Sequence, residues 1–265
     1  KEIDYPKSEF QVIVVKGKNP SDNRNKGALG ARGEIIGFLD DDAKIEKDFL
    51  KRVDNFFREY PSADIVGGPQ LTPLDEKGFA KISGYALCSK FGAGGVTKRY
   101  TVGKIDLNAD ENSITSANLF VKKEVMDKIK FDVNLFPGED PQFIHDAKKI
   151  GLKVAYCPDF VVYHKRRTRI RDLIKQIFSY GRVRPKKESI FETFKKPFFL
   201  IPSLFVIYLI FLLISGLFNL TLTGGAINLG EIPITINWLF FPLLLYVLLA
   251  LMFSIIGSMH NKDFK

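Results

Sequence analysis

The chain has 265 residues, of which 46% are hydrophobic, and a formal net charge of +9 at pH 7. This length accommodates one sizeable α/β domain with an appendage and excludes two large domains. The two cysteines, Cys88 and Cys157, lie in unrelated segments without metal-type spacing, so we expect reduced thiols in a cytosolic domain. The chain begins at Lys1 rather than at a methionine, and we expect that further sequence precedes it.

Strands and helices alternate in the first part of the chain. Apolar, β-branched runs predict strands at 10–15, 34–39 and 63–66, and helical spacing predicts a helix over 47–59. Farther on, the same patterns predict a strand at 116–121, a helix from about 122, a helix over 141–150, and strands around 153 and 160. This alternation predicts a parallel sheet covered by helices.

Three acidic residues, Asp40, Asp41 and Asp42, end the second predicted strand. Ligands of open α/β sheets bind at the carboxyl ends of the strands. Adjacent carboxylates repel one another unless a cation is bound, and their hard oxygens suit Mg²⁺ or Mn²⁺, which would also hold a diphosphate. The alternative is a charged turn that caps the next helix.

A second acidic pair, Glu139 and Asp140, precedes the helix predicted over 141–150. A carboxylate at a helix N-terminus is held ionised. Asp140 could therefore act as a general base toward an acceptor hydroxyl. The alternative is that Asp140 is a simple helix cap.

A basic belt lies between Lys165 and Lys187. It contains ten basic residues against one acid, Asp172, which accounts for the whole net charge: Lys165, Arg166, Arg167, Arg169, Arg171, Lys175, Arg182, Arg184, Lys186 and Lys187. Within it, Thr168–Gly181 has apolar residues at helical spacing, which predicts a helix lying in the headgroup plane of an anionic membrane. The alternative is a helix packed on the soluble domain.

Two uncharged apolar stretches follow the belt, Phe198–Phe218 and Trp238–Ser258. Each is long enough to cross the ~30 Å hydrocarbon core of a bilayer, which predicts two transmembrane helices. The intervening Asn219–Asn237 has no Lys or Arg, whereas both outer flanks are basic. The positive-inside rule therefore predicts a multi-pass protein of the cell membrane with both termini, and so the N-terminal domain, in the cytosol and with Asn219–Asn237 outside.

The order of motifs resembles glycosyltransferase family 2. The motifs are NRNKGALGARGEIIGFLDDD at 23–42, VGGP at 66–69, SANLFVKKEVM at 116–126, PGED at 137–140 and GLKVAYCPDFVVYHKRR at 151–167. Together with GYALCSKFGAGG at 84–95, QIFSYGR at 176–182 and the apolar C-terminal stretches, they are similar to the membrane-bound branch typified by succinoglycan-type enzymes. The resemblance covers nearly the whole chain.

The resemblance implies a Rossmann-like, GT-A-type nucleotide-binding domain with a mixed α/β sheet. It implies a catalytic domain over residues 1–166 that lacks its first strand and helix, a basic interface segment over 167–197, and a transmembrane hairpin with a short tail over 198–265.

The resemblance also implies roles for the residues that bind the donor. Asp40 and Asp42 match the family's DxD element, with Asp42 as the metal ligand and Asp40 nearer the ribose. Asn25 and Gly27 match the element that lines the donor pocket. His164 matches a residue near the diphosphate, although a lone histidine at a strand end is more often structural.

Other matched residues lie toward the sugar and the acceptor. The resemblance implies that Asp140 is the base, Glu139 its neighbour on the acceptor side, and Asn118 part of the floor under the donor sugar. Asp41, inside the DxD element, is also expected to contribute to donor binding.

These roles imply an inverting transfer from a nucleotide-sugar donor to a lipid-linked or saccharide acceptor, in cell-surface polysaccharide or glycolipid synthesis. Val15-Lys16-Gly17 stands where the family commonly has an acidic residue after the second strand, a departure that concerns recognition of the base and ribose. Gln176-Ile177-Phe178-Ser179-Tyr180 lacks the Arg-Trp of processive polysaccharide synthases, so we expect addition of one sugar. A catalytically inactive or truncated relative that acts as a binding partner is the alternative. We expect no nucleic-acid partner, because the basic belt adjoins the apolar stretches and lacks aromatic stacking platforms.

Overall fold

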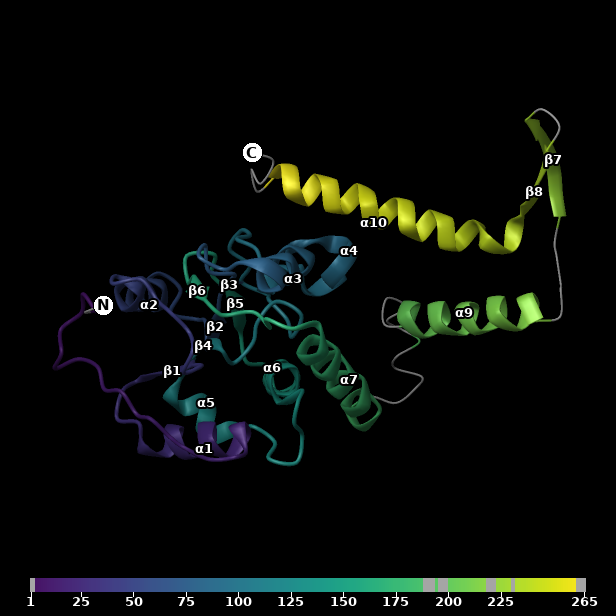
Figure 1. Ribbon diagram of the computed structural model, residues 1–265. Coiled ribbons are helices and arrows are strands. Elements are labelled where there is room, and N and C mark those ends of the chain that lie inside the picture. Colours follow the sequence, from purple (N-terminus) through teal and green to yellow (C-terminus); the bar gives the residue numbers. More distant parts are fainter. Residues whose placement is uncertain (1–2, 188–193, 195–199, 218–222, 230–231, 261–265) are drawn as a thin grey trace. The chain divides into compact units, whose positions relative to one another are not determined.

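The computed structural model describes residues 3–187, 194, 200–217, 223–229 and 232–260 (Figure 1). The chain divides into two compact units, Lys1–Lys187 and Glu188–Lys265. Each unit is described by itself.

The first unit is built on a four-stranded mixed sheet with the order β1-β4-β2-β5. Its strands are β1 (Ile35–Leu39), β2 (Ile65–Gly67), β4 (Asn118–Lys122) and β5 (Val154–Tyr156). β4 runs antiparallel to both β1 and β2, whereas β2 and β5 are parallel. The mixed sheet implied by the family resemblance is confirmed, and the all-parallel sheet predicted from alternation is wrong, because β4 lies between two strands of the opposite direction.

Helices cover both faces of this sheet. Successive strand residues point to opposite faces, so Ile65 and Leu119 belong to one apolar cluster while Val66 and Phe120 belong to the other. The helices are α1 (Pro20–Gly30), α2 (Phe49–Glu59), α5 (Lys123–Lys128) and α6 (Glu139–Lys149). Buried residues of α1, α5 and α6 pack in the first cluster, and those of α2 pack in the second.

A second, two-stranded sheet lies beside the acidic turn, the segment Asp40–Asp42 that follows β1. Its strands β3 (Gln70–Leu71) and β6 (Val162–Tyr163) are parallel. Between β3 and β4 the chain forms α3 (Gly78–Cys88), α4 (Lys90–Ala93) and the short 3-10 helix η1 (Gly94–Arg99). Lys44 and Tyr163 exchange backbone hydrogen bonds of 2.8 and 2.9 Å, which fix β6 beside the turn that follows β1.

The strand predicted at 10–15 is not formed. Its residues have no strand assignment, and the side chains of Val12 and Val14 are 74% and 75% exposed. An apolar, β-branched run gives a segment the propensity for a strand, but a strand also needs a neighbour that supplies backbone hydrogen bonds. The other predicted strands and helices of this unit are present, with shifted ends.

Helix α7 (Ile170–Lys187) completes the first unit and confirms the helix predicted over 168–181. The second unit contains α9 (Ile201–Leu217), a hairpin of β7 (Thr223–Leu229) and β8 (Ile232–Asn237), the 3-10 helix η3 (Trp238–Phe240), and α10 (Phe241–His260). Tyr208 of α9 donates a hydrogen bond of 2.5 Å from its hydroxyl to the carbonyl of Leu239.

Within the residues that the structure describes, no helix combines the length and the hydrophobicity that a membrane crossing requires. The two transmembrane helices predicted from the apolar stretches are therefore not supported.

Candidate active site

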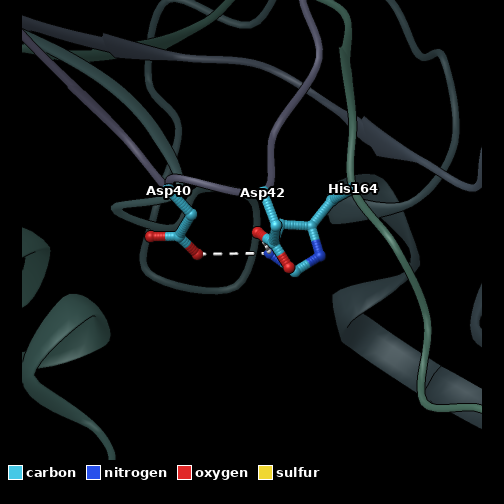
Figure 2. A group of neighbouring side chains, drawn as sticks. All are labelled: Asp40, Asp42 and His164. Carbon is cyan, nitrogen blue, oxygen red and sulfur yellow. Dashed lines mark hydrogen bonds and ion pairs between the residues drawn. The ribbon is translucent and has the colours of Figure 1, made fainter.

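The acidic turn after β1 and the end of β6 meet in one group of side chains. Asp40, Asp42 and His164 each offer a potential metal-binding atom, and these atoms lie within 4.8 Å of one another (Figure 2). Nε2 of His164 is 3.2 Å from Oδ2 of Asp40 and 3.1 Å from Oδ1 of Asp42. Asp41 is exposed in the turn and lies outside this group.

The electrostatics of the group favour the charged forms of Asp40 and His164. Burial disfavours the ionised carboxylate of Asp40, but the hydrogen bond to His164 and the charge of Arg24 outweigh it, so the pKa of Asp40 is lowered. The hydrogen bond to Asp40 raises the pKa of His164 against the opposing effect of burial, and the charge of Asp42 adds to the rise.

The donor set fits a divalent cation. Two carboxylates supply hard oxygen ligands of the kind that Mg²⁺ and Mn²⁺ prefer, and the imidazole is a ligand more typical of transition metals. Of the two expected ions, Mn²⁺ therefore fits this set better. His164 must be neutral to bind a metal, so a cation would replace its proton.

Strand direction explains why a second acidic group lies near the first. Because β4 is antiparallel to β1, the amino end of β4 meets the carboxyl end of β1, and Asn118 pairs with Leu39. Ser116, just before β4, donates a short hydrogen bond from its hydroxyl to Oδ1 of Asp140. The side chain of Asp140 is 22% exposed and thus partly accessible to a ligand.

Asp140 is not a helix cap. It is the second residue of α6, whose N-cap position is occupied by Gly138 with a φ of 118° and no side-chain cap hydrogen bond. The side chain of Glu139 is buried and accepts a hydrogen bond from the backbone N–H of Gly138 at 3.0 Å. Burial raises the pKa of Glu139, and the neighbouring charge of Asp140 raises it further.

Arg24 on α1 connects the two acidic groups. Its Nη1 lies 2.8 Å from Oε1 of Glu139 and 3.6 Å from Oδ1 of Asp140, and its Nη2 lies 3.6 Å from Oδ1 of Asp40. The guanidinium carbon is 5.4 Å from the centre of the Phe131 ring, in cation–π geometry.

Neither Arg24 nor Ser116 was predicted from the sequence as a site residue. An arginine on a polar helix reads as solvated, and neither residue belongs to a local acidic or histidine pattern. Knowledge of the strand order would have identified Ser116 as a candidate, because that order places the start of β4 beside the acidic turn.

The other residues expected in the donor site, Asn25, Asn118 and Gly27, contact other parts of the protein itself. Asn25 donates from Nδ2 to the carbonyl of Phe131 at 2.8 Å and accepts from the Phe131 N–H at 3.0 Å. Asn118 is fully buried and donates from Nδ2 to the carbonyl of Phe160, while its Oδ1 has no partner among the described residues. Gly27 faces Val15, whose Cγ2 would lie 3.5 Å from an added Cβ.

The C-terminal half of α7 lies beside the acidic pair. Cγ1 of Val183 would lie 3.6 Å from a Cβ built on Gly138. Although Tyr180 is 53% exposed as a whole residue, desolvation of its hydroxyl raises its pKa, and the charges of Tyr100 and Asp140 raise it further. The edge of the site next to Asp140 is therefore lined by α7.

Known proteins resemble this chain to different extents. A glucuronosyltransferase of Methanococcus voltae, named for dolichyl N-acetyl-alpha-D-glucosaminyl phosphate, is 23% identical over 247 residues, which cover 81% of this chain and 74% of that protein. The minor teichoic acid biosynthesis protein GgaB of Bacillus subtilis is 28% identical over 158 residues, 56% of this chain and 16% of that protein. The crystal structure of residues 1–349 of TarS from S. aureus has a TM-score of 0.40 and 18% identity, and covers 55% of this chain and 40% of that one.

The family comparison covers most of the chain, including every residue of the candidate site. The family described as "Glycosyltransferase like family 2" matches residues 1–179, from the first residue to within α7. The chain therefore belongs to glycosyltransferase family 2.

Proposed function

We propose that the chain transfers one sugar from a nucleotide-sugar donor to an acceptor hydroxyl, with inversion at the anomeric carbon. The observation that carries this proposal is the arrangement of two acidic groups at one end of the sheet. One is the cation-type group of Asp40, Asp42 and His164, and the other contains the partly exposed carboxylate of Asp140. Arg24 lies between them.

In this proposal the first group binds the donor. Asp42 and Asp40 would hold Mg²⁺ or Mn²⁺, with Mn²⁺ favoured by the imidazole of His164. When bound, such an ion supplies positive charge that stabilises a departing diphosphate. Asn118 lies under this end of the sheet, where its buried amide fixes the backbone of Phe160.

Asp140 would act on the acceptor. Its carboxylate takes the proton of the acceptor hydroxyl while the hydroxyl oxygen attacks the anomeric carbon and the nucleoside diphosphate leaves with the electrons of the broken C–O bond. This single displacement inverts the anomeric centre. It requires one base and no covalent enzyme intermediate, and the partly exposed carboxylate of Asp140 can serve as that base.

We also propose that the site works at the cytosolic face of the cell membrane. The exposed apolar residues of α7 share one face at helical spacing, each 59–67% exposed: Ile170, Ile174, Ile177 and Phe178. Exposed basic residues form an adjoining stripe: Arg171, Lys175 and Arg182. An apolar face with basic residues at its border suits a helix lying in the headgroup region of anionic lipid.

A membrane surface beside the site favours a lipid-linked acceptor. The opposite side of α7 lies next to Gly138 and Asp140, so an acceptor held in the bilayer would reach Asp140 along this helix. The name of the Methanococcus voltae relative describes a lipid-phosphate-linked acceptor, and that of GgaB describes teichoic acid synthesis. We therefore place the reaction in cell-surface polysaccharide or glycolipid synthesis, as also expected from the succinoglycan-type resemblance.

The proposal is tested by incubating the full chain with Mn²⁺, each nucleotide sugar of a panel, and an acceptor. The acceptors are either lipids extracted from membranes or soluble saccharides. We expect one donor to release nucleoside diphosphate, with matching incorporation of sugar into an acceptor. Tight binding of a donor without release or incorporation, across the panel and both acceptor types, would instead favour a noncatalytic binding protein.

A further inference from the structure

We infer that Arg24 and Ser116 are positioning residues that fix one oxygen of Asp140 and leave the other for the acceptor's proton. We further infer that Arg24 links Asp140 to the cation side of the site. This inference rests on the proposed function, because it gives Asp140 the role of base. Neither residue was identified from the sequence.

The contacts of Asp140 are concentrated on one oxygen. Ser116 donates to Oδ1, and Nη1 of Arg24 lies 3.6 Å from the same atom. Within the part of the chain that the structure describes, no hydrogen bond or ion pair reaches Oδ2. A carboxylate anchored through one oxygen keeps its orientation while the second oxygen remains able to accept a proton.

Both positioning residues are themselves held in place. Ser116 is 1% exposed, so its hydroxyl has little freedom to turn toward water. The side chain of Arg24 is 16% exposed and is fixed by Glu139 at 2.8 Å and by the ring of Phe131. Phe131 is in turn tied to α1 by the two hydrogen bonds of Asn25.

The single positive charge of Arg24 also interacts with three carboxylates. Glu139 and Asp140 are adjacent, and Glu139 is buried, so without Arg24 their charges would repel each other in a poorly solvated place. The third partner, Asp40, belongs to the candidate cation group. A substitution of Arg24 should consequently affect both Mn²⁺ binding at Asp40 and catalysis at Asp140, whereas a substitution of Ser116 should affect Asp140 alone.

Steady-state kinetics on the full chain test the positioning role. We expect Ser116→Ala to lower kcat about 10- to 100-fold, since small displacements of a reacting group can cost about 100-fold, while the donor KM stays unchanged. Ser116→Thr keeps the hydroxyl and should recover most of kcat. Arg24→Gln should lower kcat by a similar factor, with partial recovery in Arg24→Lys. Lys26→Gln, on the same helix but paired with Asp22, is the matched control and should leave kcat unchanged.

The link to the cation side is tested by titrating Mn²⁺ alone into the same variants. Removing the charge of Arg24 should tighten Mn²⁺ binding about threefold or more, because a cation next to Asp40 repels the metal. Ser116→Ala should bind Mn²⁺ as the wild type does. Thermal unfolding shows whether each variant is folded. If Arg24→Gln does not fold, Ser116→Ala still tests whether Asp140 must be held through one oxygen.

The outcomes separate this inference from the function on which it rests. A wild-type kcat in Ser116→Ala, or unchanged Mn²⁺ affinity in a folded Arg24→Gln, would overturn the inference and leave the proposed function standing. A lower donor affinity in Arg24→Gln would also overturn it, because Arg24 would then be a donor ligand. If the wild type transfers no sugar, the proposed function fails, while the Mn²⁺ titration still decides the role of Arg24.

Discussion

His164 lies with its Nε2 3.2 Å from Oδ2 of Asp40, and each residue shifts the pKa of the other toward the charged state. The pair joins the turn after β1 to the end of β6, two segments far apart in the sequence.

The first prediction concerns the pH dependence of the metal-free protein. The pKa of His164 is raised above 6.5 by folding, so its stabilising effect is complete below 6.5 and is lost as pH rises through the folded-state value. The pKa of Asp40 is lowered below 3.8, so its effect is present above 3.8 and is lost as pH falls through the folded-state value. We expect the stability difference between wild type and His164→Gln to be largest between these limits.

Chemical denaturation in the presence of a chelator measures this difference across the pH range. The difference should decline on the alkaline side, where Mn²⁺ binding should strengthen because a neutral imidazole is free to bind the metal. A difference that grows with rising pH would show that the His164–Asp40 pair is not ionised in the folded protein.

The second prediction concerns the cation group. Asp42→Asn should weaken Mn²⁺-dependent binding of a nucleoside diphosphate at least about tenfold. Even replacing a residue that only hydrogen-bonds to a metal ligand costs about 10- to 100-fold in metal affinity or activity. Asp41→Asn is the matched control, because Asp41 is exposed and outside the group. Calorimetry with and without Mn²⁺ gives both affinities. Equal metal-dependent affinity in the two variants would remove Asp42 from the site.

The third prediction concerns the exposed face of α7. Lys175→Gln should weaken binding to vesicles containing anionic lipid about fivefold, because each basic residue near such a surface contributes about 1 kcal/mol. Ile177→Ser should weaken binding through the apolar face, and both changes should alter the free energy of unfolding by less than about 0.5 kcal/mol, since the two side chains are exposed.

Vesicle co-sedimentation with anionic and neutral lipid separates the two contributions, and Lys26→Gln on α1 serves as the charge-matched control. If Ile177→Ser unfolds the domain readily, the face packs on protein and the membrane interpretation is wrong. Equal binding to both lipid types would remove the role of the basic stripe.

The fourth prediction concerns Asn25. Its two hydrogen bonds to the backbone of Phe131 indicate that Asn25→Ala should lower the free energy of unfolding by about 1–3 kcal/mol, the cost of leaving buried polar groups unpaired. Donor affinity should fall less than in Asp42→Asn. A large loss of donor affinity at unchanged stability would favour the direct donor-pocket role implied by the family resemblance.

Local patterns predicted the elements of the first unit well where each element also found a partner. The strand at 34–39 is formed because β4 pairs with it, whereas the equally apolar 10–15 remains without a strand assignment. Strand direction was beyond local patterns, because it depends on which segments pair. The wrong prediction of an all-parallel sheet follows from the antiparallel β4.

The candidate site was predictable where acidic residues cluster in the sequence. The motif order pointed to Asp40, Asp42, Asp140 and His164, and the cation group of the structure contains three of them. Arg24 was not predictable, because its role arises only when α1, β1 and α6 come together in the fold. Asn25 was assigned to the donor pocket by resemblance, whereas its contacts in the structure are with the backbone of Phe131.

The central claim is that Asp140 is the base of a sugar transfer, and the most direct test is the transfer rate of Asp140→Asn with donor binding measured separately. Asparagine keeps the shape and can still accept the Ser116 hydrogen bond, but it cannot take the acceptor's proton at neutral pH. We predict a fall of about 10²- to 10⁴-fold in rate with unchanged donor affinity and unchanged thermal unfolding. Transfer at a near wild-type rate by a folded Asp140→Asn protein would contradict the account.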